Sequence, residues 1–94
     1  MSLELFAAVC ECRSITRAAE LHHITASAVS KRVTQLEQLT GASLLLRTHS
    51  GVVPTNDGTR LLEHARTVLS GVEAIERELG RRGPVTVDPI VPGR

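Results

Sequence analysis

Aromatic residues are nearly absent from this chain of 94 residues: Phe6 is the only one, and there is no tryptophan or tyrosine. The hydrophobic core must therefore be built from aliphatic side chains. The same scarcity argues against an extended surface for single-stranded nucleic acid, because such surfaces stack bases on aromatic rings. A chain of this length has room for one small domain and an appendage.

Cysteines are also few, and no pattern of metal ligands accompanies them. Cys10 and Cys12 are too close for an ordinary disulfide within a helix, so we expect two reduced thiols, one in the core and one near the surface. The four histidines lack the spacing of a zinc site. No nucleophile motif, glycine-rich phosphate loop or carboxylate pair is present. We therefore predict no catalytic residue, no metal, no cofactor and no enzymatic activity.

Long hydrophobic runs are missing as well. The apolar stretch at residues 5–10 is too short to span a membrane, and it follows Glu4 rather than a basic leader. We therefore expect neither a signal peptide nor a membrane segment, and a cytoplasmic protein. The formal net charge of +1 does not by itself indicate nucleic acid. Residues 25–60 nevertheless carry a small basic excess, with four Lys or Arg side chains against Glu37 and Asp57.

The hydrophobic pattern predicts a mainly α-helical fold with one β-hairpin. Ser14 and Thr25 are plausible N-caps of the second and third helices, and Gly41 is expected to stop the third. The helices are expected at residues 2–11, 15–21 and 26–40, with a long fourth helix from Thr55 or Asn56 to about Gly80. Two short strands, 44–47 and 52–54, flank a polar tip.

The third helix has two contrasting faces. Its inward side is predicted to contain Ala28, Val29, Val33, Leu36 and Leu39. The opposite side carries Ser27, Ser30, Lys31, Thr34 and Gln38. An ordinary solvated face usually mixes Glu and Lys at a spacing of four residues. Short hydroxyl side chains instead allow the helix backbone to approach another surface closely.

The fourth helix carries a heptad seam. Its members alternate at spacings of four and three residues: Leu61, Ala65, Val68, Val72, Ile75 and Leu79. Leu62 and Leu69 lie beside the seam and can face the small domain. A helix of about 24 residues is roughly 36 Å long, which is too long for this domain to cover. We therefore predict a winged domain at 1–58, a dimerisation helix at 59–80, and a tail or linker at 81–94.

Four sequence strings in this order resemble the LysR-type family of bacterial transcription regulators. Residues 14–20, SITRAAE, are similar to the family's SFTRAAE. Ala28 to Lys31, with Val33, Leu36-Glu37, Leu39 and Gly41, resembles its recognition-helix pattern AVSRxIxxLExxLG. Residues 44–47 look like its LFxR strand, and residues 54–58 look like its LTxAG entry to the linker helix. The resemblance covers residues 3 to about 80 and is specific because the strings share order and spacing.

The resemblance implies a three-helix winged helix-turn-helix with a two-stranded wing and a long dimerisation helix. It also implies a homodimer that binds double-stranded DNA, with helix 26–40 in the major groove and wing 47–53 near the minor groove. A small-molecule inducer would bind only a carboxy-terminal effector domain, which this chain lacks. The predicted DNA-binding residues are Thr25, Ala26, Ser27, Ser30, Lys31, Arg32, Thr34, Gln35, Thr48, His49 and Ser50.

The chain departs from the family pattern in several places. Arg13 stands where the family usually has glycine, which suggests a rearranged turn. Ala26 and Ser27 replace a common Gln-Pro, and His49 and Ser50 occupy the wing tip where an arginine is frequent. The operator therefore cannot be transferred from relatives. Arg17 fits either a phosphate contact or a surface charge, and Arg47 fits either a structural role or a contact with DNA.

Three alternatives stay open at this stage. A winged scaffold without specific DNA binding would serve as a protein-interaction module. Cys10 and Cys12 would be central to a small metal-dependent or thiol sensor. Another winged-helix family would keep DNA binding, although a heptad helix directly after the wing argues against many of these.

Overall fold

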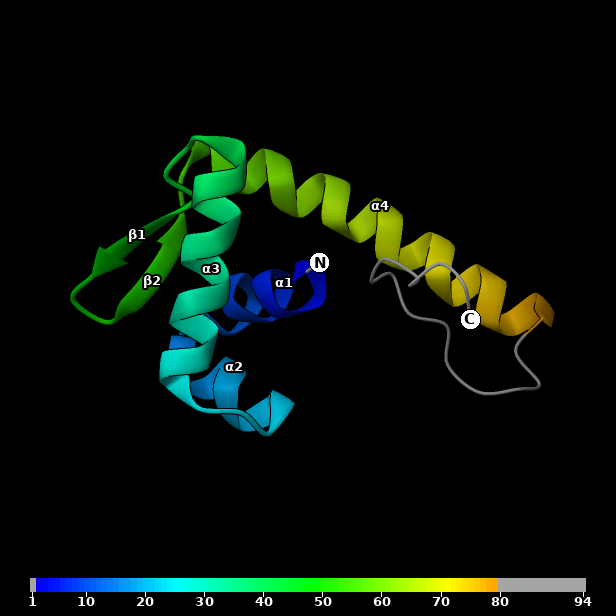
Figure 1. Ribbon diagram of the computed structural model, residues 1–94, viewed down its shortest axis with the longest axis horizontal. Coiled ribbons are helices and arrows are strands. Elements are labelled where there is room, and N and C mark those ends of the chain that lie inside the picture. Colours follow the sequence, from blue (N-terminus) through cyan, green and yellow to red (C-terminus); the bar gives the residue numbers. More distant parts are fainter. Residues whose placement is uncertain (1, 80–94) are drawn as a thin grey trace, which may run out of the picture.

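The structure is a computed structural model that describes residues 2–79. Its elements follow the predicted order: α1 (Leu3–Cys12), α2 (Ile15–His22), α3 (Ala26–Thr40), β1 (Leu45–Thr48), β2 (Gly51–Pro54) and α4 (Asn56–Leu79). Figure 1 shows α1 to α3 gathered with the two strands at one end, while α4 extends away from them. The predicted mainly helical winged helix-turn-helix is confirmed. The predicted tail, 81–94, lies outside the described residues, as does Gly80.

Side-chain caps explain where α2, α3 and α4 begin. The Ser14 hydroxyl accepts a hydrogen bond from the Arg17 amide, and the Thr25 hydroxyl accepts one from the Ala28 amide, each at 3.0 Å. At the start of α4 the Thr55 hydroxyl accepts a hydrogen bond from the Gly58 amide at 2.9 Å. Thr55, rather than Asn56, is therefore the N-cap of α4. These bonds satisfy amides that a helix leaves unpaired in its first turn.

Arg13 ends α1 in the left-handed backbone conformation, with φ of 55°. The residue therefore adopts a geometry that favours glycine, instead of forming a rearranged turn, at a cost of about 1–2 kcal/mol for a non-glycine residue. The Arg13 carbonyl accepts a hydrogen bond of 3.1 Å from the Val52 amide in β2. A side chain on the neighbouring Gly51 would collide with this carbonyl. The turn after α1 thus holds β2 near the tip of the wing.

The core is aliphatic apart from one ring. Its fully buried members of largest volume are Phe6, Leu44, Val9 and Val29. One cluster joins α1, α2, α3 and the wing, and the buried Ala18 and Ala19 give α2 a small-residue face inside it. A second cluster joins α1, the end of α3 and α4, and contains Cys10. Cys10 is buried and Cys12 half-buried, as the sequence predicted.

Leu39 was predicted to face inward, and this was wrong: its side chain is 72% exposed. The inward line of α3 runs through Val29, Val33 and Leu36, and a helix that turns about 100° per residue puts position 40 rather than 39 closest to that line. Thr40 is at that position, where the helix has left the core: it is exposed and donates a hydrogen bond of 2.9 Å to the Leu36 carbonyl. In the family pattern the leucine directly precedes the glycine, and here Thr40 holds that place.

The first half of α4 belongs to the domain core. Leu62 and Ala65 are buried, while Leu61 and Leu69 pack partly against the second cluster. Ala65 has no exposed surface, so its prediction as a dimer-interface residue was wrong, because it already faces the domain's own core. Because α4 starts at Asn56, the predicted boundary at 58/59 falls within its first turn.

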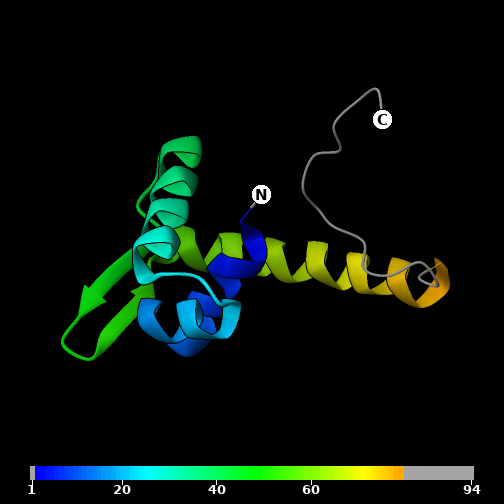
Figure 2. The same ribbon diagram turned by 60° about the horizontal axis from the view of Figure 1, so that its bottom comes forward.

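The wing is a two-stranded antiparallel hairpin. Its register pairs Leu45 with Pro54 and Arg47 with Val52. Figure 2 shows the hairpin projecting beside α3, with its tip away from the helices. Val52 is buried in the first core cluster and lies one pair from the tip, so β2 is fixed up to this position while Thr48, His49 and Ser50 are exposed. Within residues 2–79, no helix is long and apolar enough to cross a membrane.

Candidate nucleic-acid interface

The outward face of α3 is exposed and free of acidic side chains. Ser27, Lys31 and Thr34 are all exposed, and none of them uses its side chain in a hydrogen bond or ion pair with another residue of 2–79. Ser30 borders this face and is half-buried. The structure therefore brings these four predicted DNA-binding residues together on α3 as a set of uncommitted donors. Gln35 is exposed nearby, further around the helix.

The amino-terminal end of α3 is open to solvent. Thr25 and Ala26 are exposed, and the Thr25 hydroxyl is already used as the cap. The amides of Ala26 and Ser27 belong to the first turn, where a helix offers no carbonyl partner. Such amides, together with the helix dipole, favour a phosphate at this end.

Arg32 occupies a different side of α3 from the other predicted contacts. Its guanidinium donates to the Ser2 hydroxyl at 3.4 Å, next to the start of α1. It therefore does not share the outward face with Lys31, its neighbour in sequence. Its predicted contact with DNA stays a prediction for a residue at the edge of the interface.

The wing tip consists of exposed polar residues. Thr48 ends β1, and His49 and Ser50 form the turn. All three side chains are exposed, and among the described residues none of them forms a hydrogen bond or ion pair. The tip can therefore reach a surface beside the one that α3 approaches.

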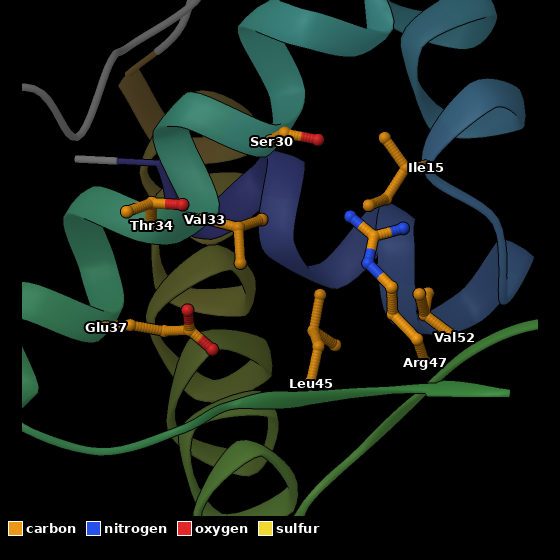
Figure 3. Close-up of a pocket in the computed structure, with 8 residues that line it drawn as sticks. All are labelled: Ile15, Ser30, Val33, Thr34, Glu37, Leu45, Arg47 and Val52. Carbon is orange, nitrogen blue, oxygen red and sulfur yellow. The ribbon is translucent and has the colours of Figure 1, made fainter.

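A cleft separates α3 from the wing, and the sequence pattern alone did not reveal it. Its volume is about 110 Å³, several times the 10–15 Å³ or so that one water requires. The lining residues, drawn in Figure 3, are Ile15, Ser30, Val33, Thr34, Glu37, Leu45, Arg47 and Val52. The strand alternation was the available signal, because it puts Arg47 on the same strand face as the core-packed Leu45.

The titratable groups outside the α3 face and the wing form no metal site within residues 2–79. Within residues 2–79, no three His, Cys, Asp or Glu side chains lie together as a metal site would require. Burial raises the pKa of the Cys10 thiol to about 11, with Arg66 lowering it and Glu11 raising it by smaller amounts. A thiol with this pKa stays protonated at neutral pH and reacts slowly.

Comparison with known proteins agrees with this architecture. Residues 1–59 match the family model described as bacterial regulatory helix-turn-helix protein, lysR family. The nitrogen assimilation regulatory protein nac of Klebsiella aerogenes is 38% identical over 81 residues, covering 86% of this chain and 27% of that protein. The HTH-type transcriptional regulator CfxR of Cupriavidus necator is 40% identical over 77 residues, covering 82% of this chain and 24% of its own length. This chain thus spans about a quarter of these relatives.

Solved structures extend the likeness to three dimensions. The BenM DBD/catB site 1 DNA complex superposes with a TM-score of 0.79 at 32% identity, covering 84% of this chain and 88% of that one. The CbnR DBD–DNA complex gives a TM-score of 0.71 at 30% identity, covering 85% and 94%. The chain therefore belongs to the LysR family of bacterial regulatory helix-turn-helix proteins.

Proposed function

We propose that this chain binds specific sequences of double-stranded DNA as the DNA-binding part of a cytoplasmic transcription regulator, and that it is not an enzyme. The observation that carries the proposal is the outward face of α3, where Ser27, Lys31 and Thr34 are exposed and their side chains form no hydrogen bond or ion pair within residues 2–79. The likeness to two DNA complexes at 30% identity or more supports it.

On this proposal α3 enters the major groove and the wing lies at the minor groove. Lys31 donates to a guanine edge, where N7 and O6 both accept hydrogen bonds. Ser27 and Thr34 bind phosphate or base edges directly or through water. Their short side chains let the helix backbone approach the bases. Because the net charge is only +1, we expect weak non-specific binding and a modest dependence of affinity on salt.

The functional unit on this proposal is a homodimer formed through α4. Val68 and Ile75 are each 43% exposed and Leu79 is 72% exposed, while Val72 is half-buried. These residues follow the heptad seam beyond the part that the domain covers. Pairing two such helices would bury them and place two recognition helices on an inverted repeat.

Regulation by an inducer would belong to a part of the protein outside this chain. The relatives named above are about four times longer than the region matched here. On this proposal, no residue of 2–79 binds the inducer.

The test is selection from a random pool of duplexes with the 94-residue chain, run beside Lys31→Ala and Arg77→Gln. Arg77 is an exposed α4 residue outside the seam, so its variant is a control for the loss of one positive charge. We expect enrichment of an inverted repeat by the wild type and by Arg77→Gln, but not by Lys31→Ala. If the wild type enriches no sequence at moderate salt, the proposal fails and a protein-interaction module replaces it.

A further inference from the structure

Arg47 holds a distinctive position at the cleft between α3 and the wing. It lies on β1 opposite Val52, and the aliphatic part of its side chain runs beside Val52 (Figure 3). Its guanidinium is directed toward Ile15 and the Ser30 hydroxyl, across the opening of the cleft. The side chain is exposed overall, so it covers apolar surface with its stem while its charged end stays accessible.

The guanidinium has no partner within residues 2–79. No carboxylate pairs with it, and it donates no hydrogen bond to another described side chain. The hydroxyls of Ser30 and Thr34, which line the same cleft, are also without hydrogen bonds there. One guanidinium and two hydroxyls thus line a cavity of about 110 Å³, and none of them donates a side-chain hydrogen bond within residues 2–79.

Glu37 is the one acidic residue among those that line the cleft. Its carboxylate oxygen Oε2 accepts from the Leu44 amide at 2.8 Å. Figure 3 shows it below Thr34 and directed toward Leu45, on the other side of the cleft from the guanidinium of Arg47. The positive end of the cleft, between Arg47 and Ser30, is therefore separate from its negative end.

The geometry of duplex DNA indicates what faces this positive end. The major and minor grooves are separated by a sugar–phosphate strand, so a protein with α3 in one groove and its wing at the other must straddle that strand. The cleft lies between these two elements. Fork-shaped guanidinium donors and hydroxyls are among the side chains that contact phosphate oxygens.

We propose that Arg47, with Ser30, binds a phosphate of the strand that passes between the recognition helix and the wing. The inference rests on the proposed function, since it presupposes that both elements engage a duplex. It gives the cleft a role in affinity and register rather than in the choice of bases. Arg47 is thereby a DNA-contacting residue that lies neither on the outward face of α3 nor at the wing tip.

The experiment measures the affinity of wild type, Arg47→Gln, Arg47→Lys and Arg77→Gln for the selected duplex and for a random duplex, across a range of salt concentrations. Arg47→Gln should weaken binding by about tenfold or more on both duplexes, because a charge-assisted phosphate bond carries no sequence information. The slope of log affinity against log salt should fall by about 0.9 for each Arg47, and hence by about 1.8 per dimer. Arg47→Lys should keep the slope and recover part of the affinity.

A second arm locates the phosphate. Duplexes with a single neutral methylphosphonate are scanned along each strand against wild type and Arg47→Gln. We expect one position in each half-site at which the neutral linkage weakens the wild type but has little further effect on Arg47→Gln. Thermal unfolding of the variants in the absence of DNA shows whether a loss of affinity reflects a loss of folded protein.

Two results overturn the inference without touching the proposed function. In one, the wild type binds its selected sequence while Arg47→Gln keeps its affinity and salt slope. In the other, Arg47→Gln loses affinity only in proportion to its loss of stability, and no methylphosphonate position is coupled to it. Failure of the wild type to select any sequence would instead overturn the proposed function, and this inference with it.

Discussion

The carboxylate of Glu37 accepts a hydrogen bond of 2.8 Å from the backbone amide of Leu44, seven residues further along the chain. Glu37 lies in the last turn and a half of α3, and Leu44 immediately precedes the wing. Leu44 is only 1% exposed, so its amide has little access to water. This bond ties the end of α3 to the segment that leads into the wing.

Removing the acceptor should therefore destabilise the fold. We expect Glu37→Ala to lower the free energy of unfolding by about 1–3 kcal/mol, the usual cost of a buried amide without a partner. Glu37→Gln keeps a carbonyl oxygen of similar reach and should lose less. Urea unfolding followed by circular dichroism measures both variants, and equal losses for the two would contradict this role of the carboxylate.

Two glycines of α4 should respond to alanine in opposite directions. A Cβ on Gly58 would collide with the Leu44 carbonyl, whereas one on Gly71 would meet nothing within 4 Å. We expect Gly58→Ala to be strongly destabilising, because backbone has to move. Gly71→Ala should stabilise the exposed helix by about 0.5–1 kcal/mol. Thermal unfolding compares the two, and a stable Gly58→Ala variant would mean that α4 does not approach Leu44 this closely.

The seam of α4 should divide into a part that folds the domain and a part that joins two copies. Ile75→Glu should weaken dimerisation at least tenfold while leaving the helical signal of the monomer intact, because each copy loses an apolar contact worth about 1 kcal/mol or more. Ala65→Leu should instead destabilise the monomer by about 1–3 kcal/mol through overpacking. Sedimentation equilibrium and urea unfolding separate these effects. A monomeric but fully stable Ala65→Leu protein would place Ala65 back in the interface.

Cys10 should make stability fall at alkaline pH. Burial raises the pKa of its thiol from 9.0 to about 11 in the folded protein. Between these values the unfolded chain has lost the proton that the folded chain retains, so rising pH favours unfolding. The contribution is fully present below about pH 9 and is lost as pH rises through about 11, and we expect a loss on the order of 1–3 kcal/mol.

Cys10→Ala supplies the control for this pH effect. The variant loses packing at every pH but has no thiol at this position, so its urea midpoint should fall less between pH 8.5 and 10.5 than that of the wild type. If the urea midpoints of the two proteins fell equally with pH, the Cys10 thiol would have the same pKa in the folded and unfolded chains.

Most of the secondary structure was predictable because its causes are local. Ser14 and Thr25 cap the helices that follow them, and Gly41 takes the left-handed conformation that ends α3. The wrong predictions concern helical residues whose periodicity does not say which other segment packs against them. Leu39 and Ala65 are both apolar and helical, yet one lies beyond the reach of the core and the other within it.

The outward face of α3 was predictable for the same reason, since its residues repeat along one helix. The surroundings of Arg32 and Arg47 were not predictable, because each side chain meets an element that is distant in sequence. Arg32 reaches Ser2 across 30 residues of sequence, and Arg47 faces α3 and Ile15 only once the hairpin has docked. Strand alternation gives the face of Arg47 but not what lies opposite it.

The sequence by itself determined the order of the helices, the position of the hairpin, the polar face of α3 and the family of the chain. These features follow from caps, turn residues and side-chain periods that act within a few residues. Only the tertiary structure decided which part of α4 the domain covers, which side Arg32 occupies, and that between α3 and the wing lies a cleft whose arginine is unpaired within residues 2–79. The reason is that burial and pairing depend on which segments, far apart in sequence, come to lie against each other.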